Sequence, residues 1–183
     1  MLFGLVMSTA HGSRQIDRSN DGSQDGSQGR ADQTVLVIGG SGFLGTHVCL
    51  KLREAYKVFA TYHTRRVAIR GVTFLPFNVE NRNWVKRVIY TTQPDVVIYL
   101  AGNNNVKWSE ENHRMSERIH SNGPATLATT TDTMQPRFIF VSNAYVFDGS
   151  RGNYHESDIV LPSTVLGRMK VGGENVIKNK CLN

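Results

Sequence analysis

Cysteine is scarce in this chain. The sequence contains only two, Cys49 and Cys181, which stand far apart and show no metal-ligand spacing. Disulfide scaffolds need several cysteines, and structural zinc sites need closely spaced ones. We therefore expect reduced thiols, no metal site and a cytoplasmic location.

Long apolar runs are also missing. No stretch approaches the roughly 20 apolar residues that a membrane-spanning helix needs. Residues 1–10 are largely apolar, but no basic residue precedes them, which makes them a poor secretory signal. The sequence therefore predicts no membrane association.

Basic residues outnumber acidic ones, but they do not cluster. The chain has 21 Lys and Arg against 15 Asp and Glu, a formal net charge of +6, without a run of five or six positive residues. A nucleic-acid face concentrates its charge and interleaves it with aromatic residues. We expect a solvated basic surface and no nucleic-acid partner.

Large apolar residues are nearly absent from residues 11–33, which include a tandem DGSQ at 21–28. A segment of this composition can bury too little apolar surface to offset the conformational entropy that it would lose on ordering. The sequence predicts a disordered, low-complexity tail over residues 1–33. The folded domain is predicted over residues 34–183.

From Thr34 onward, short β-branched runs alternate with stretches of helical spacing. This alternation with short connections predicts a doubly wound parallel α/β sheet of the Rossmann type. Ligands of such folds bind beyond the carboxyl ends of the strands. The expected strands are 34–39, 57–62, 72–77, 95–102 and 137–143, and the expected helices are 46–55, 81–93, roughly 110–134 and about 164–179.

A glycine loop follows the first expected strand. It reads Gly39-Gly-Ser41-Gly42-Phe43-Leu44-Gly45 and leads directly into a helix. Glycine permits a tight turn and lets the backbone approach a pyrophosphate, which a helix N-terminus favours. The loop therefore predicts dinucleotide binding; a purely structural turn is the alternative.

The second expected strand ends without the carboxylate that would bind the 2′-hydroxyl of an adenine ribose. Arg65 and Arg66 stand there instead, and both are suited to a 2′-phosphate. NADP is favoured slightly over NAD on this basis, with two solvated arginines as the alternative. Asn78, after the third strand, is a candidate adenine contact or a turn residue.

Four stretches carry a family resemblance. The glycine spacing, "PDVVIYLAG", "SNAYVFDGSRGNYHESD" and "LGRMKVGGE", in this order, resemble the extended short-chain dehydrogenase/reductase family over residues 34–180. The likeness is greatest to dTDP-4-dehydrorhamnose reductases and their sugar-nucleotide-binding relatives, which act in dTDP-rhamnose biosynthesis. The resemblance implies a nucleotide-sugar ligand, with a homodimer as a possible assembly.

The resemblance also implies site residues. It places NAD(P) along Gly39–Gly45, Asn78–Val79 and the three residues Ala101, Gly102 and Asn103. It gives Lys170 the role of holding the nicotinamide ribose, and it makes Ser142 a catalytic candidate.

Two departures from the family pattern fall on the chemistry. Asn143 stands where the family has a threonine that helps to bind the substrate carbonyl, and Leu166 replaces the tyrosine of Y-x-x-x-K. That tyrosine donates a proton because nearby positive charge lowers its pKa, and leucine has no ionisable proton. Tyr154 is a candidate substitute donor, whereas Tyr145 matches a separate family tyrosine and His155 fits a surface loop.

A third departure is the length of the match. The family would continue into a sixth strand and a substrate-binding domain, so we expect an incomplete domain or a reduced binder, with an exposed edge on the fifth strand. Two readings follow. One is an active NADPH-dependent reductase of a nucleotide-linked keto-sugar. The favoured one is a cofactor- and sugar-nucleotide-binding relative with impaired catalysis, or a non-catalytic subunit resembling the regulatory subunit of methionine adenosyltransferase.

Overall fold

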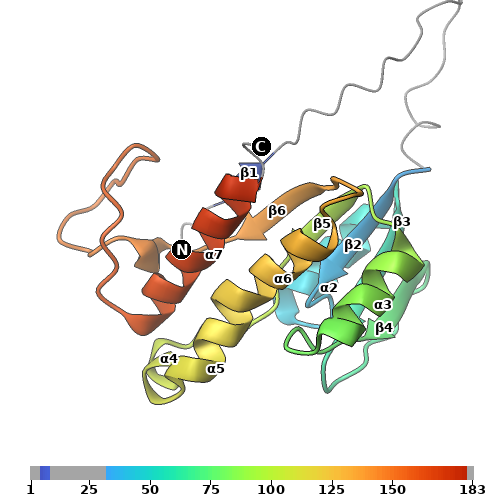
Figure 1. The fold of residues 1–183 in the computed structure, drawn as a ribbon, viewed down its shortest axis with the longest axis horizontal. Helices are drawn as coiled ribbons and strands as arrows, with labels where there is room; N and C mark the ends of the chain where they lie inside the picture. The colour runs from blue at the N-terminus through green and yellow to red at the C-terminus, as the bar shows by residue number, and fades with distance from the viewer. Residues whose placement is uncertain (1–4, 9–31, 181–183) are drawn as a thin grey trace, which may run out of the picture.

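The computed structural model describes residues 5–8 and 32–180 (Figure 1). Most of the predicted tail and Cys181 lie outside the described residues. The disorder of residues 9–31 and the redox state of Cys181 therefore stay predictions. Cys49 lies within the core as a free thiol, and burial raises its pKa to about 11.

One sheet organises the described part of the chain. Its strand order is β1-β6-β5-β2-β3-β4, and every pair from β6 to β4 is parallel. This confirms the predicted doubly wound parallel sheet. The strands are β1 (Leu5–Ser8), β2 (Thr34–Ile38), β3 (Lys57–Tyr62), β4 (Val72–Pro76), β5 (Val96–Tyr99) and β6 (Arg137–Val141).

Helices cover both faces of the sheet (Figure 1). Helices α3 (Arg82–Thr92), α6 (Gly123–Thr130) and α7 (Val165–Lys180) pack on one face, and α2 (Phe43–Leu52) packs on the other. Side chains of β2 alternate between the two resulting cores: Leu36 faces the first and Val37 the second. A strand buried on both faces needs an unbroken apolar run, which residues 35–38 supply.

The helix expected over roughly 110–134 is wrong as a single element. The structure divides this region at Asn112, whose φ of −129° and ψ of 52° lie outside the helical range. The region begins earlier than expected because Asn105 caps its first helix, accepting from the Trp108 amide at 2.9 Å. The segments are α4 (Val106–Glu111), α5 (His113–Glu117), the π-helical turn η1 (Arg118–Asn122) and α6.

Strand β1 corrects the prediction at the edge of the sheet. Residues 5–8 were expected within the disordered tail, but they pair antiparallel with β6, with Leu5 opposite Val141 and Ser8 opposite Phe138. The outer edge of β6 offers unpaired backbone groups, and an extended apolar segment can satisfy them. The edge expected to be exposed is therefore covered along this register.

Candidate functional site

The glycine loop lies against the end of β5, as predicted. Gly39 has a φ of +84°, and its amide donates to the Thr61 hydroxyl at 2.9 Å. A Cβ added to Gly39 would lie 2.7 Å from the Ala101 amide nitrogen, so the loops after β2 and β5 touch. A Cβ added to Gly45 would lie 2.3 Å from the Gly39 carbonyl oxygen, so Gly45 permits the tight packing of loop and helix.

Helix α2 begins at this loop without a side-chain cap. Its N-cap residue is Gly42, and its first turn contains no acidic residue. Gly42 is exposed, and an added Cβ would meet only the Gly39 carbonyl oxygen, at 3.3 Å. Phe43 beside it is 88% exposed. The first amides of α2 are therefore available to an anion, which the helix dipole also favours.

The residues predicted to contact the adenosine half of a dinucleotide have fewer contacts that fix their side chains. Arg65 and Arg66 are exposed, and neither is recorded in an ion pair or a hydrogen bond with the described residues. Asn78 uses its side-chain oxygen to accept from the Glu80 amide at 2.9 Å, so it forms a turn. Val79 packs against α6, where a Cβ added to Gly123 would lie 2.5 Å from it.

Lys170 is buried at the end of β6, where it is 4% exposed. Its ammonium donates to the Val141 carbonyl at 3.0 Å and lies 5.1 Å from the centroid of the Phe140 ring. Burial lowers the pKa of Lys170 to about 8, against the opposing attraction of Glu174. The group therefore stays largely protonated at neutral pH, at a cost in folding energy.

Leu166 lies one turn before Lys170 and is fully buried. The start of α7 packs closely on the preceding loop, because a Cβ added to Gly167 would lie 2.0 Å from the Tyr145 carbonyl oxygen. A buried aliphatic side chain thus stands beside Lys170 where the family pattern has a proton donor.

Ser142 and Asn143 follow β6 directly. Ser142 is 2% exposed, and its hydroxyl has no hydrogen-bond partner among residues 5–8 and 32–180. Asn143 accepts from the Tyr145 amide at 3.1 Å and so caps the 3-10 turn η2 (Ala144–Val146), while its buried side-chain nitrogen lacks a partner among the same residues. Asn143 therefore has a structural role, and Ser142 keeps a hydroxyl that is free to donate.

The Tyr154 side chain is held by contacts within its own loop. Its hydroxyl donates to Asp148 at 2.5 Å, and its ring stacks on Phe147 with centroids 4.4 Å apart. The hydrogen bond from Tyr154 is the largest cause of the lowered pKa of the Asp148 carboxyl. Tyr154 would have to break these contacts to act as a substitute proton donor.

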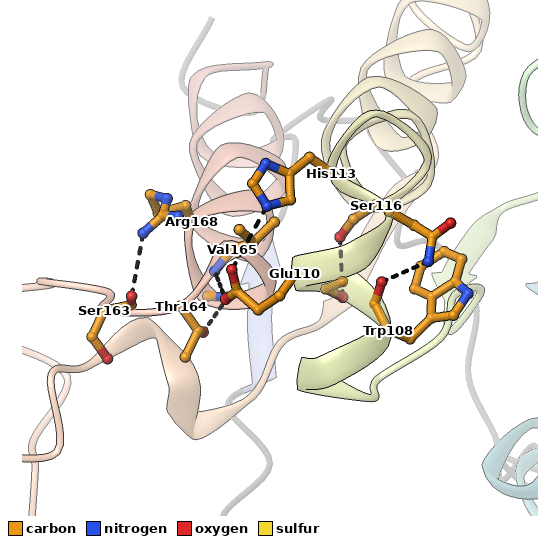
Figure 2. A network of polar contacts seen from close by, with 11 residues as sticks. Trp108, Glu110, His113, Ser116, Ser163, Thr164, Val165 and Arg168 are labelled. Carbon is orange, nitrogen blue, oxygen red and sulfur yellow. Dashed lines mark hydrogen bonds and ion pairs between the residues drawn. The ribbon is translucent and has the colours of Figure 1, made fainter.

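Sequence reasoning missed Glu110, which reaches α7 from α4. Its carboxylate accepts from the Val165 amide at 2.8 Å, and His113 lies 3.7 Å from its other oxygen (Figure 2). Thr164 caps the same helix start by accepting from the Gly167 amide at 3.0 Å. The helix that carries Leu166 and Lys170 is thus anchored by a residue from another element.

Replacing Glu110 by alanine should lower the free energy of unfolding by about 1 kcal/mol, because α7 loses an acidic cap. The measurement is urea denaturation. Glu111→Ala is the matched control: Glu111 is the next residue of α4, and its recorded ion pair is the exposed one with Lys107 at 4.0 Å. Equal losses in the two variants would contradict a capping role.

His120 was also missed. It is fully buried, and its ring contacts the loop after β5. Helical spacing gives a partial signal, because Leu127 and Thr131, seven and eleven residues later, are also buried. Spacing does not identify the loop that the His120 ring contacts.

Among residues 5–8 and 32–180, no helix is long and apolar enough to cross a membrane, and no group of three or more His, Cys, Asp or Glu could hold a metal ion. An open hollow lies over α4 and α5, lined by Glu110–Met115 and Arg118. It contains none of the predicted site residues.

Comparison with known proteins found similar chains. The chain is 27% identical over 150 residues to methionine adenosyltransferase 2 subunit beta from Bos taurus, covering 80% of this chain and 43% of that protein. It is 29% identical over 147 residues to a probable low-salt glycan biosynthesis reductase from Haloferax volcanii, covering 79% and 49%. The chain thus spans under half the length of these curated relatives.

A solved structure shows the same fold. It is a dTDP-4-dehydrorhamnose reductase from Bacillus anthracis in complex with NADP, with a TM-score of 0.69 and 22% identity over 80% of this chain and 49% of that one. The family model described as the RmlD substrate binding domain matches residues 33–183. This chain therefore belongs to the RmlD substrate-binding-domain family.

Proposed function

We propose that the chain binds a nicotinamide dinucleotide across the loops that follow β2 and β5. The main support is the start of α2 at Gly42, which has no side-chain cap and lies between Gly39 and Gly45. At Gly39 this loop touches the loop that contains Ala101. The residues fit such a ligand: the loop leaves room above Gly42, and Lys170 and Ser142 supply hydrogen-bond donors near the end of β6. A bound nicotinamide would supply a hydride.

NADP is the favoured form of the dinucleotide. Arg65 and Arg66 are exposed and form no ion pair with the described residues, so a 2′-phosphate would not have to compete with a carboxylate from that part of the chain. The solved Bacillus anthracis relative carries NADP, which supports nicotinamide nucleotides as a ligand class.

The second ligand is a nucleotide-linked sugar, and its reduction is impaired. Reduction of a keto group requires a proton at the developing alkoxide, and Leu166 cannot donate one. Ser142 can donate a hydrogen bond to a carbonyl oxygen, and Lys170 can hold ribose hydroxyls. The chain therefore retains binding and orienting groups without the acid.

A non-catalytic subunit is the second candidate function. Full burial of Leu166 favours it, because no ionisable group replaces the missing tyrosine at that position. Methionine adenosyltransferase 2 subunit beta, a subunit by its name, is among the similar chains. Measurable keto-sugar reduction by the wild type would exclude this candidate.

NADPH should raise the melting temperature of the wild type, and Gly42→Val should abolish the shift. The expected stabilisation is about 2.7 kcal/mol when NADPH is at 100 times its Kd. Gly42 suits this test because its φ of −74° is open to any residue and an added Cβ would meet only the Gly39 carbonyl oxygen, at 3.3 Å, so the loop has to give by a few tenths of an ångström. Gly71→Ala is an unsuitable control because Gly71 has a φ of +82°. Gly152→Ala, with nothing within 4 Å, serves instead. A folded sample unmoved by millimolar NADPH and NADH would refute the proposal.

A further inference from the structure

His120 lies beneath the loop that follows β5. A Cβ added to Gly102 would lie 2.1 Å from the His120 ring, and Gly102 has a φ of +134°. The Nε2 atom of His120 lies 3.1 Å from the Asn103 carbonyl oxygen. One side chain thus supports two consecutive residues of this loop.

The hydrogen-bond partner determines the tautomer of His120. A carbonyl oxygen can only accept, so Nε2 must carry the proton. Burial, followed by the nearby charge of Lys170, lowers the pKa of His120 to about 3, so the ring is neutral at pH 7. The Nδ1 atom is then a bare acceptor, and it has no hydrogen-bond partner in the part of the chain that the structure describes.

The backbone around His120 is also unusual. Residues 118–122 form a π-helical turn, a feature that occurs frequently at functional sites. Helix α7 presses on this turn, because a Cβ added to Gly173 would lie 2.4 Å from the His120 carbonyl oxygen. The turn therefore sits between the helix of Lys170 and the loop of Asn103.

We infer that His120 is a positioning residue, which holds the Gly102–Asn103 loop in its ligand-ready form through the bond from Nε2–H to the Asn103 carbonyl. This inference rests on the proposed function, because the loop is one wall of the proposed dinucleotide site. His120 touches no proposed ligand and acts only through the loop.

The test compares His120→Phe, which keeps a ring and loses the donor, with His120→Gln, whose amide can still donate to Asn103. Hydrogen exchange is followed at the Asn105 amide, which donates to the Asn103 side chain at 3.0 Å. The phenylalanine variant should speed this exchange roughly tenfold and weaken the Kd for NADPH roughly 5- to 20-fold. The glutamine variant should restore both to within about threefold.

Nitrogen-15 NMR of the wild type tests the hydrogen bond without any variant, and it should show His120 protonated at Nε2. His120→Met replaces the phenylalanine variant if that one fails to fold. A ring protonated at Nδ1, or unchanged exchange in the phenylalanine or methionine variant, would overturn the inference. Absence of NADPH binding by the wild type would refute the proposed function instead, while the exchange and tautomer results would still decide the role of His120.

Discussion

A Lys170→Met variant should be more stable than the wild type at pH 7, by about 1–2 kcal/mol, and should bind NADPH roughly 10- to 100-fold more weakly. The lowered pKa of Lys170 corresponds to a net cost of roughly 3 kcal/mol for keeping the ammonium buried, with the attraction of Glu174 already included. Methionine removes that net cost but also loses the bond to the Val141 carbonyl, about 1 kcal/mol. The weaker binding follows from the loss of a charged donor.

The stability advantage of Lys170→Met should depend on pH. The pKa of Lys170 is about 8 in the folded protein and 10.5 in the unfolded chain, so the unfolded chain binds more protons between these pH values. The free energy of unfolding of the wild type therefore rises as the pH rises from about 8 toward 10.5. Below pH 8 the full cost of burying the ammonium is present. The advantage of Lys170→Met should shrink as the pH rises from 8 toward 10.5.

Lys178→Met is the matched control for this experiment. Lys178 lies on the same helix, its side chain is 51% exposed, and it pairs with Glu174 at 3.7 Å. Its removal leaves the buried Glu174 carboxylate without this partner, so it should lower the free energy of unfolding by about 1 kcal/mol, opposite in sign to Lys170→Met, and leave NADPH binding intact. A Lys170→Met protein that binds NADPH like the wild type would remove Lys170 from the proposed site.

Leu166→Tyr should raise the rate of NADPH oxidation with a dTDP-4-keto-sugar roughly 10²-fold over a negligible wild-type rate. The change places a phenol one turn before the Lys170 ammonium, whose charge lowers a phenol pKa. We expect the lower end of the range because Leu166 is fully buried and the larger side chain must find space. Adding Asn143→Thr should increase the rate further.

The measurement is single-turnover NADPH oxidation with the protein in excess. Leu166→Phe is the control, since it adds the ring without the hydroxyl and should stay at the wild-type rate. Equal rates for the tyrosine and phenylalanine variants would show that the phenol does not act as the acid. Fast wild-type turnover that survives Leu166→Ala would show that another residue supplies the proton.

The parallel strands were predictable because each is a local apolar run bounded by turn residues. The run over residues 57–62 coincides with β3, and the run over 34–39 extends one residue beyond β2. The contact between Gly39 and Ala101 was also predictable, because the carboxyl ends of neighbouring parallel strands share one edge of the sheet.

Other features depend on tertiary contacts that local patterns do not record. Glu110 caps a helix that begins 55 residues later in the chain. The burial of His120 depends on α7 packing over the π-helical turn, and the pairing of residues 5–8 depends on the free edge of β6. None of these partners is close in sequence, so spacing alone could not assign them.

Binding of a nicotinamide dinucleotide at the glycine loop can be tested directly. A titration of nitrogen-15-labelled protein with NADPH, followed by NMR, locates any binding residue by residue. We expect saturable shifts of the amides of Gly39–Gly45 and Ala101–Asn103, which Gly42→Val abolishes. Shifts confined to the hollow at Glu110–Met115, or none in a folded sample at millimolar NADPH or NADH, would contradict it.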